Sequence, residues 1–217
     1  MRTFLIAGLA LAMSGCGNIA NIRAYSTAYV EPASGDTARL RIITNGMARG
    51  VPGRDCIDWR VPGAGVMAVS ESGFADQNNG RSLGMPESHR RVEGQALART
   101  ELKVPAGKPF AMNFQSEGYA SGGYSYSCRQ SFRFTPQVGE DYELILLESG
   151  QCLVALQCLN VMGKPESEPV EKAGLCRALA ECGAYALSGV GEPDSGDVEL
   201  LTDFATLHKA FGLGWTI

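Results

Sequence analysis

The sequence predicts a mainly β fold, an antiparallel β-sandwich that carries a small helical appendage at its C-terminal end. Short segments alternate polar and apolar residues, and Gly- or Pro-containing turns separate them about every 8–12 residues. Clear helical spacing of apolar residues occurs only near the C-terminus. The chain has 217 residues, 45% of them hydrophobic and 19% charged, which fits one globular domain with an appendage.

The first element is a predicted signal peptide, residues 1–15. Arg2 precedes an apolar run over residues 4–13, which has the length of a signal core and is too short to span a bilayer. The run ends in Met-Ser-Gly-Cys, which resembles the lipobox of bacterial lipoproteins. This resemblance implies cleavage before Cys16 and acylation of that residue by diacylglyceryl and palmitate groups. A plain secretory signal is the alternative, but Met13 occupies the position where such a signal needs a small residue.

Acylation at Cys16 implies attachment to a bacterial membrane. Gly17 follows the cysteine, where an Asp would indicate inner-membrane retention in enteric bacteria, so we expect the periplasmic face of the outer membrane. Residues 16–36 form an acylated tether, and about 15 flexible residues span roughly 20 Å. The folded part should therefore stay close to the membrane.

The sandwich is predicted over residues 37–162. Residues 38–43 and 66–69 are expected strands, and the stretch between them is rich in Gly, Pro and charge and is expected to be a loop. Residues 71–94 form a long polar excursion. Residues 98–104 and 109–114 flank a Pro-Ala-Gly-Lys turn and predict a hairpin.

The last predicted strands form a three-stranded meander over residues 127–161. A C-terminal extension, residues 163–217, should then pack on the sandwich with helices at 173–180 and 197–211. The second of these places apolar residues at steps of three and four, between Asp197 as N-cap and Gly212 as C-cap.

Six cysteines remain after Cys16, and an even number in an exported chain predicts disulfides. Cys152 and Cys158 would be about 20 Å apart along one strand, so we expect them to pair with Cys56 and Cys128, in either combination. A local bridge could join the remaining two. The full set of disulfide candidates is Cys56, Cys128, Cys152, Cys158, Cys176 and Cys182. No CxxC occurs, and the spacing predicts no metal site.

A second resemblance covers residues 38–158. The run RTELKVPAGKPF at 99–110, followed by C-x5-FTP-x2-G-x2-YE from Cys128, is similar to a group of uncharacterised proteobacterial lipoproteins. The resemblance implies a small disulfide-containing β-sandwich behind the lipobox, Ig-like or transthyretin-like in outline. It implies no activity, because the shared residues are turns and cysteines.

The sequence offers few groups for catalysis. There is no nucleophile elbow, HExxH, Walker A loop or EF-hand, and His89 and His208 stand far apart. We therefore predict no catalytic residue, metal or cofactor. A net charge of −4 gives no basic field for nucleic acid. The Tyr/Ser/Gly stretch with Tyr119, Tyr124 and Tyr126 has the composition of an adaptable recognition loop.

The leading hypothesis is a membrane-anchored envelope lipoprotein that acts as a non-enzymatic binding or structural module, with an envelope protein as its partner. Two alternatives stay open. One is a periplasmic hydrolase with its site near the 71–94 loop. The other is a carrier of a small apolar ligand, which would need a cavity lined by Phe110, Phe132 and Phe134.

Overall fold

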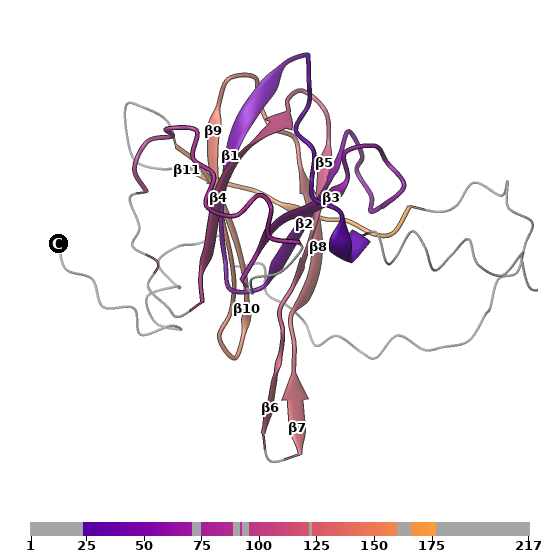
Figure 1. Cartoon of the computed structure of the whole chain (residues 1–217), viewed down its shortest axis with the longest axis vertical. Helices are drawn as coiled ribbons and strands as arrows, with labels where there is room; N and C mark the ends of the chain where they lie inside the picture. The colour runs from indigo at the N-terminus through magenta and orange to yellow at the C-terminus, as the bar shows by residue number, and fades with distance from the viewer. Residues whose placement is uncertain are drawn as a thin grey trace, which may run out of the picture.

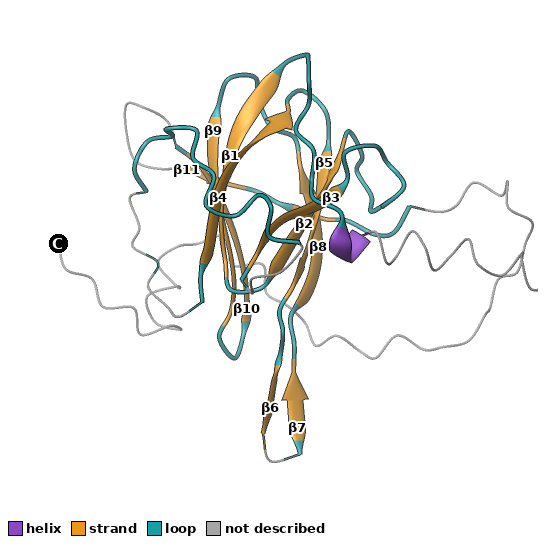
Figure 2. Ribbon diagram, in the orientation of Figure 1, coloured by secondary structure: helices purple, strands orange, loops and turns teal. Residues whose placement is uncertain are grey.

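The computed structural model describes residues 24–70, 75–88, 92, 96–121, 123–159 and 166–176. These residues form two five-stranded sheets, face to face, and a two-stranded ribbon that projects from one end (Figure 1). The predicted mainly β sandwich is confirmed. A single helical turn at residues 24–26 is the helix content of this part of the chain (Figure 2). The helix predicted at 197–211 lies outside the described residues.

The first sheet has the strand order β11-β10-β9-β1-β4. Its strands are β1 (Thr37–Thr44), β4 (Ala98–Pro105), β9 (Asp141–Glu148), β10 (Cys152–Cys158) and β11 (Glu166–Glu168). The central pair, β1 and β9, is parallel, with Arg39 opposite Asp141, whereas the other pairs in this sheet are antiparallel. The predicted purely antiparallel sandwich is thus corrected at one pair.

The second sheet has the order β12-β8-β5-β2-β3 and is antiparallel throughout. Its strands are β2 (Met47–Pro52), β3 (Gly65–Val69), β5 (Phe110–Gln115), β8 (Arg129–Phe134) and β12 (Glu171–Lys172). The chain between β5 and β8 continues beyond the sheet as a ribbon made of β6 (Tyr119–Ser121) and β7 (Tyr124–Tyr126).

The core lies between the sheets and follows the alternation in the sequence. Leu40 and Ile42 of β1 face Phe110, Met112 and Phe114 of β5, all fully buried in one cluster. Burying side chains of this size is the largest favourable contribution to folding, about 1.5–3 kcal/mol each. The strands predicted at 38–43, 66–69 and 109–114 are confirmed by their burial.

Two predicted connections differ from the structure. The chain segments around the Pro105–Lys108 turn were expected to pair as a hairpin, but β4 belongs to the first sheet and β5 to the second. Likewise, the expected meander is split, because β8 lies in the second sheet and only β9 and β10 pair as consecutive strands. Turn chemistry, such as the positive φ of 69° at Gly107, reverses the chain without deciding which sheet it enters.

Three further expectations are corrected. The loop predicted between residues 44 and 62 contains β2, whose Gly50 lets Met67 and Phe110 approach its backbone closely. The tether prediction for residues 16–36 includes Tyr29, which is buried in the core. Residues 173–176, predicted to begin a helix, are extended, and Leu175 bridges Ile57.

Candidate functional site

Among the described residues, the β6–β7 ribbon projects furthest from the sandwich (Figure 1). Tyr119 lies opposite Tyr126, and Ser121 lies opposite Tyr124. Directly paired positions share a face of an antiparallel ribbon, as do positions two apart. The register therefore places positions 119, 124 and 126, the predicted recognition residues, on one face.

The base of the ribbon is held by several contacts. A disulfide joins Cys128, just after β7, to Cys152 of β10 and so links the two sheets. The Tyr126 hydroxyl lies 3.4 Å from the Cys152 sulfur and 3.7 Å from the Cys128 sulfur. The Ser116 hydroxyl accepts a hydrogen bond from the Cys128 amide at 2.8 Å. The ribbon is thus fixed where it leaves the body.

The Tyr126 side chain is 39% exposed although it touches the disulfide. Partial burial, and then the charge of Glu148, raises the pKa of Tyr126. Its hydroxyl therefore stays protonated at neutral pH and can both donate and accept hydrogen bonds. An exposed, neutral tyrosine on a rigid base suits protein recognition, because it offers a large contact area at low entropy cost.

The other cysteines complete the disulfide pattern. The second bridge joins Cys56 to Cys176, because residues 173–176 lie beside Ile57 and bring the two sulfurs together. The prediction that Cys152 pairs with Cys56 or Cys128 is confirmed, because it pairs with Cys128. The prediction that Cys158 pairs with one of them is wrong. A local bridge between Cys176 and Cys182 is excluded, because Cys176 pairs with Cys56. Cys158 is a buried free thiol, and Cys182 lies outside the described residues.

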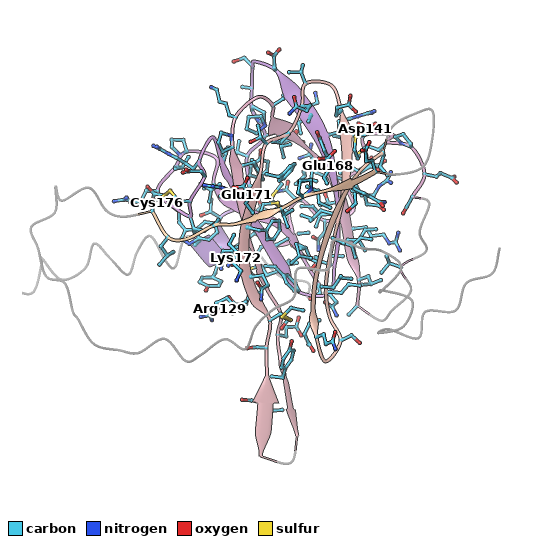
Figure 3. The ribbon with its side chains drawn as sticks, turned by 180° about the vertical axis from the view of Figure 1, so that it is seen from behind. Arg129, Asp141, Glu168, Glu171, Lys172 and Cys176 are labelled. Carbon is cyan, nitrogen blue, oxygen red and sulfur yellow. A yellow bond between two sulfur atoms is a disulfide. The ribbon has the colours of Figure 1, made fainter. Side chains whose placement is uncertain are left out.

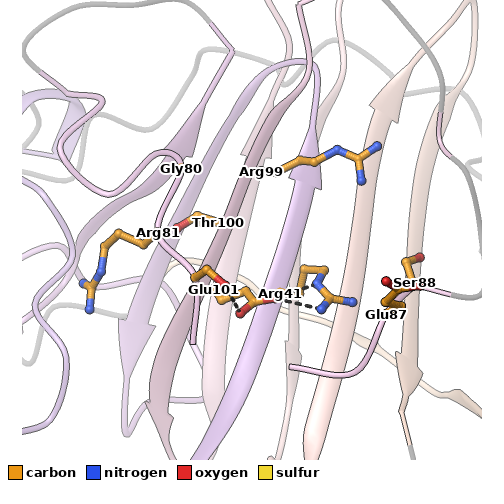
Figure 4. Close-up of a pocket in the computed structure, with 9 residues that line it drawn as sticks. Arg41, Gly80, Arg81, Glu87, Ser88, Arg99, Thr100 and Glu101 are labelled. Carbon is orange, nitrogen blue, oxygen red and sulfur yellow. Dashed lines mark hydrogen bonds and ion pairs between the residues drawn. The ribbon is translucent and has the colours of Figure 1, made fainter. Parts of the chain in front are cut away.

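A pocket of about 450 Å³ lies on the outer face of the first sheet, beneath residues 80–88 (Figure 4). This segment follows the 71–74 stretch and His89 comes directly after it, but both of those lie outside the described residues. The pocket is lined by Arg41, Gly80, Arg81, Ser82, Glu87, Ser88, Arg99, Thr100 and Glu101.

The floor of this pocket is a buried ion cluster centred on Arg41 of β1. Its guanidinium donates to Glu101 at 2.7 and 3.0 Å and to Glu143 at 3.1 Å. It also donates to the backbone carbonyls of Met85 and Pro86, at 3.2 and 2.6 Å. Arg41 thus ties three strands of the sheet to the segment that covers them.

Both carboxylates have further donors. Glu101 accepts from the amides of Leu83 and Met85, and Glu143 accepts from Ser88 at 2.8 Å and Gln157 at 2.7 Å. Burial alone would raise the pKa of Glu101, but the hydrogen bonds from Arg41 and the two amides outweigh it and hold that pKa below its usual range. A carboxylate held ionised in this way is poorly suited to act as a general acid.

The two arginines at the pocket rim also have interaction partners within the protein. Arg81 forms an ion pair with Glu31 at 2.9 Å, and Arg99 donates to the Val92 carbonyl at 2.8 Å. The arrangement of charges therefore explains how an irregular segment is held on a sheet. Sequence reasoning missed this cluster, because charged residues at alternate strand positions predict a solvated face.

The phenylalanines proposed to line an apolar cavity pack in the core instead. Phe110 and Phe134 meet edge to face at 6.2 Å, and Phe134 contacts Tyr142 in the same way at 5.5 Å. Phe132 is buried in the same cluster. Phe134 also borders a second surface pocket, whose other walls include the charged residues Asp55, Arg133, Glu168 and Glu171, so this pocket is not an apolar cavity.

Within the described ranges, no group of three His, Cys, Asp or Glu side chains is placed to hold a metal ion. In the same part of the chain, no helix is long and apolar enough to cross a membrane. The sequence matches no protein-family model and no curated protein sequence.

Proposed function

We propose that this chain is a lipid-anchored protein of the bacterial envelope that uses the β6–β7 ribbon to bind a partner protein. The observation that carries the proposal is the ribbon itself. It extends beyond both sheets, places three tyrosine positions on one face, and is fixed at its base by the Cys128–Cys152 disulfide. Tyrosine is enriched at protein interfaces, because its ring is apolar and its hydroxyl forms hydrogen bonds.

Two features support the envelope location. The Met-Ser-Gly-Cys sequence ending at Cys16 has the lipobox pattern, and two disulfides join distant parts of the chain. Disulfides persist in oxidising compartments such as the bacterial periplasm. A diacylated or triacylated Cys16 anchors stably, because each buried CH₂ contributes about 0.8 kcal/mol.

The pocket beneath residues 80–88 has a structural role in this proposal. Arg41, Glu101 and Glu143 bind one another and the covering segment, so their charges are already compensated. Recognition is therefore assigned to the ribbon, which is anchored to the sandwich through Tyr126 and the disulfide at its base.

Site-specific photo-cross-linking in intact cells tests the proposed recognition. A photoreactive phenylalanine analogue replaces Tyr124, or Ser125 on the opposite face, or Val138, which is 59% exposed in the β8–β9 connection. We expect one partner band that is strong at position 124, weaker at 125 and absent at 138. Equal bands at all three positions, or no band at 124, would refute the ribbon as the binding element.

Acylation is tested separately with labelled palmitate. The wild-type chain should incorporate the label and float with outer-membrane vesicles, and Cys16→Ala should do neither. A Cys158→Ala chain is the matched control, because it also removes a thiol and should still be labelled. Membrane retention of the Cys16→Ala chain after washing would disprove the anchor.

A further inference from the structure

A second arginine on the sandwich has surroundings opposite to those of Arg41. Arg49 of β2 lies on the outer face of the second sheet and is 4% exposed. Its guanidinium is stacked between the rings of Tyr25 and Trp59, at 4.1 and 4.5 Å from their centroids, and it donates one hydrogen bond to Asn113. Its Nε has no hydrogen-bond partner.

No carboxylate among the described residues pairs with Arg49 or with its neighbour Arg129 of β8. Burial lowers the pKa of Arg49, Tyr25 opposes this effect, and the charge of Arg129 lowers the pKa further. A guanidinium nevertheless stays protonated in proteins. The two like charges on this face therefore repel each other, and neither has a carboxylate partner among the described residues, whereas Arg41 has two.

This face is accessible next to the buried guanidinium. Arg129 is exposed, and Figure 3 shows it on β8 toward the ribbon end of the second sheet. The Tyr25 side chain is 40% exposed, and Trp59 is half-buried. Tyrosine and tryptophan are the residues that favour the membrane–water interface, and arginine binds phosphate groups through paired N–H donors.

The position of Tyr25 in the chain adds an independent argument. It follows Cys16 by nine residues. A chain of that length spans at most about 30 Å when extended, and about 17 Å as a flexible coil. If Cys16 is acylated, the face around Tyr25 must lie close to the lipid headgroups.

We propose that this face, formed by Tyr25, Trp59, Arg49 and Arg129, docks on the phosphate groups of the anionic lipids in which Cys16 is anchored. The proposal rests on the lipid anchor of the proposed function. Arg129 contacts phosphate directly, Arg49 adds positive potential from beneath, and the two rings lie at the headgroup level. Because the chain carries a net charge of −4, an anionic membrane repels the protein on average and favours an orientation that presents these two cations.

Fluorescence quenching in vesicles tests the orientation. The acylated full chain carries Trp215→Phe, so that Trp59 is its one remaining tryptophan. It is reconstituted in phosphatidylglycerol or phosphatidylcholine vesicles that contain a headgroup-level spin-labelled lipid. We expect strong quenching of Trp59 in phosphatidylglycerol, weaker quenching in phosphatidylcholine, and loss of the difference at about 0.5 M salt, where screening is strong.

Substitutions give the matched comparison. Arg129→Gln should reduce the docking equilibrium constant in phosphatidylglycerol vesicles by about fivefold, the effect of one cation near an anionic surface. Lys108→Gln removes the same charge from the exposed turn between β4 and β5 and should leave quenching unchanged. Equal quenching in both lipids, or equal effects of the two substitutions, would overturn the proposal.

The remaining outcomes separate the possible failures. If the protein floats with vesicles but Trp59 is not quenched, the lipid anchor is supported and the docking proposal is wrong. That result is expected if residues 177–217 of the chain, and not lipid, cover this face. If the protein does not float, the anchor itself is wrong.

Discussion

Removing Arg41 should destabilise the fold strongly, because it leaves two buried carboxylates without their cation. The side chain of Glu143 is fully buried and that of Glu101 is 10% exposed. Breaking a buried ion pair from one side costs about 3–5 kcal/mol. Both carboxylates keep other hydrogen-bond donors, so we expect Arg41→Ala to lower the free energy of unfolding by about 3 kcal/mol and Tm by about 6–12 °C.

The pH dependence gives a second signature. In the wild-type fold the pKa of Glu101 is lowered, so its stabilising contribution is complete above its unfolded pKa of about 4.3 and is lost as pH falls through the folded pKa. Without Arg41, burial favours the protonated acid. The free-energy difference between wild type and Arg41→Ala should therefore be largest near neutral pH, begin to shrink as pH falls through the raised pKa of Glu101 in the variant, and go on shrinking down to the lowered wild-type pKa.

Urea unfolding followed by circular dichroism measures both effects. Arg133→Ala is the matched control, because Arg133 also pairs with two carboxylates, Asp55 and Glu171, but these are 59% and 70% exposed. Exposed pairs contribute at most about 1 kcal/mol. A loss for Arg41→Ala no larger than that for Arg133→Ala, or a difference that grows as pH falls, would refute the reasoning.

Three further predictions concern the disulfides, the buried thiol and the close backbone contacts of the sandwich. Replacing Cys56 and Cys176 together by Ser should lower the free energy of unfolding by about 5 kcal/mol, and replacing Cys128 and Cys152 together should lower it by about 3.5 kcal/mol. The first loss is larger because that disulfide joins residues 120 positions apart, whereas the second joins residues 24 positions apart. Burial and a hydrogen bond to Glu140 raise the pKa of Cys158 to about 12. After treatment with a thiol-alkylating reagent at pH 8, peptide mapping should therefore find Cys158 unmodified in the native protein and alkylated in urea. Equal alkylation in both conditions would contradict this prediction. Gly65→Ala drives a Cβ into the Thr27 carbonyl oxygen and should speed hydrogen exchange at the Val66 amide, whereas Gly174→Ala, with open space around it, should not.

The sequence predicts individual strands better than their partners. Alternation in β1 and β5 marks Leu40 and Phe110 as core residues, since period-two burial is a local property. The parallel pairing of β1 with β9 joins positions about 100 residues apart, and no local pattern encodes it. The sequence does not reveal strand β2, because its Gly50 and Pro52 are residues typical of loops. Gly50 is nevertheless required in this strand, because Met67 and Phe110 pack against its backbone.

The candidate site shows the same limit. The Tyr/Ser/Gly composition around Tyr124 predicts an adaptable recognition loop from local properties of the sequence, and its recognition role stays a prediction. The Arg41 cluster and the Arg49 stack are assembled from strands and loops distant in sequence, and their charges look like ordinary solvated positions. The sequence did contain one indication of the Arg41 cluster. A long polar segment without secondary structure in a compact domain needs specific contacts that hold it on the fold.

Two of the four outer sheet edges, those of β3 and β4, are covered by other parts of the chain, which supports assigning the proposed recognition to the ribbon. The outer edge of β3 is bonded by residues 27–29 and by the Asn79 side chain, which donates to and accepts from Val69. The outer edge of β4 is bonded by residues 80–81 and by Glu31, which accepts from the Lys103 amide at 2.7 Å. Unpaired edges invite strand addition, so these contacts prevent the body of the sandwich from pairing with other chains there. The ribbon is instead a two-stranded sheet with no third strand among the described residues, so its backbone edges are unpaired and the proposed partner can add a strand there.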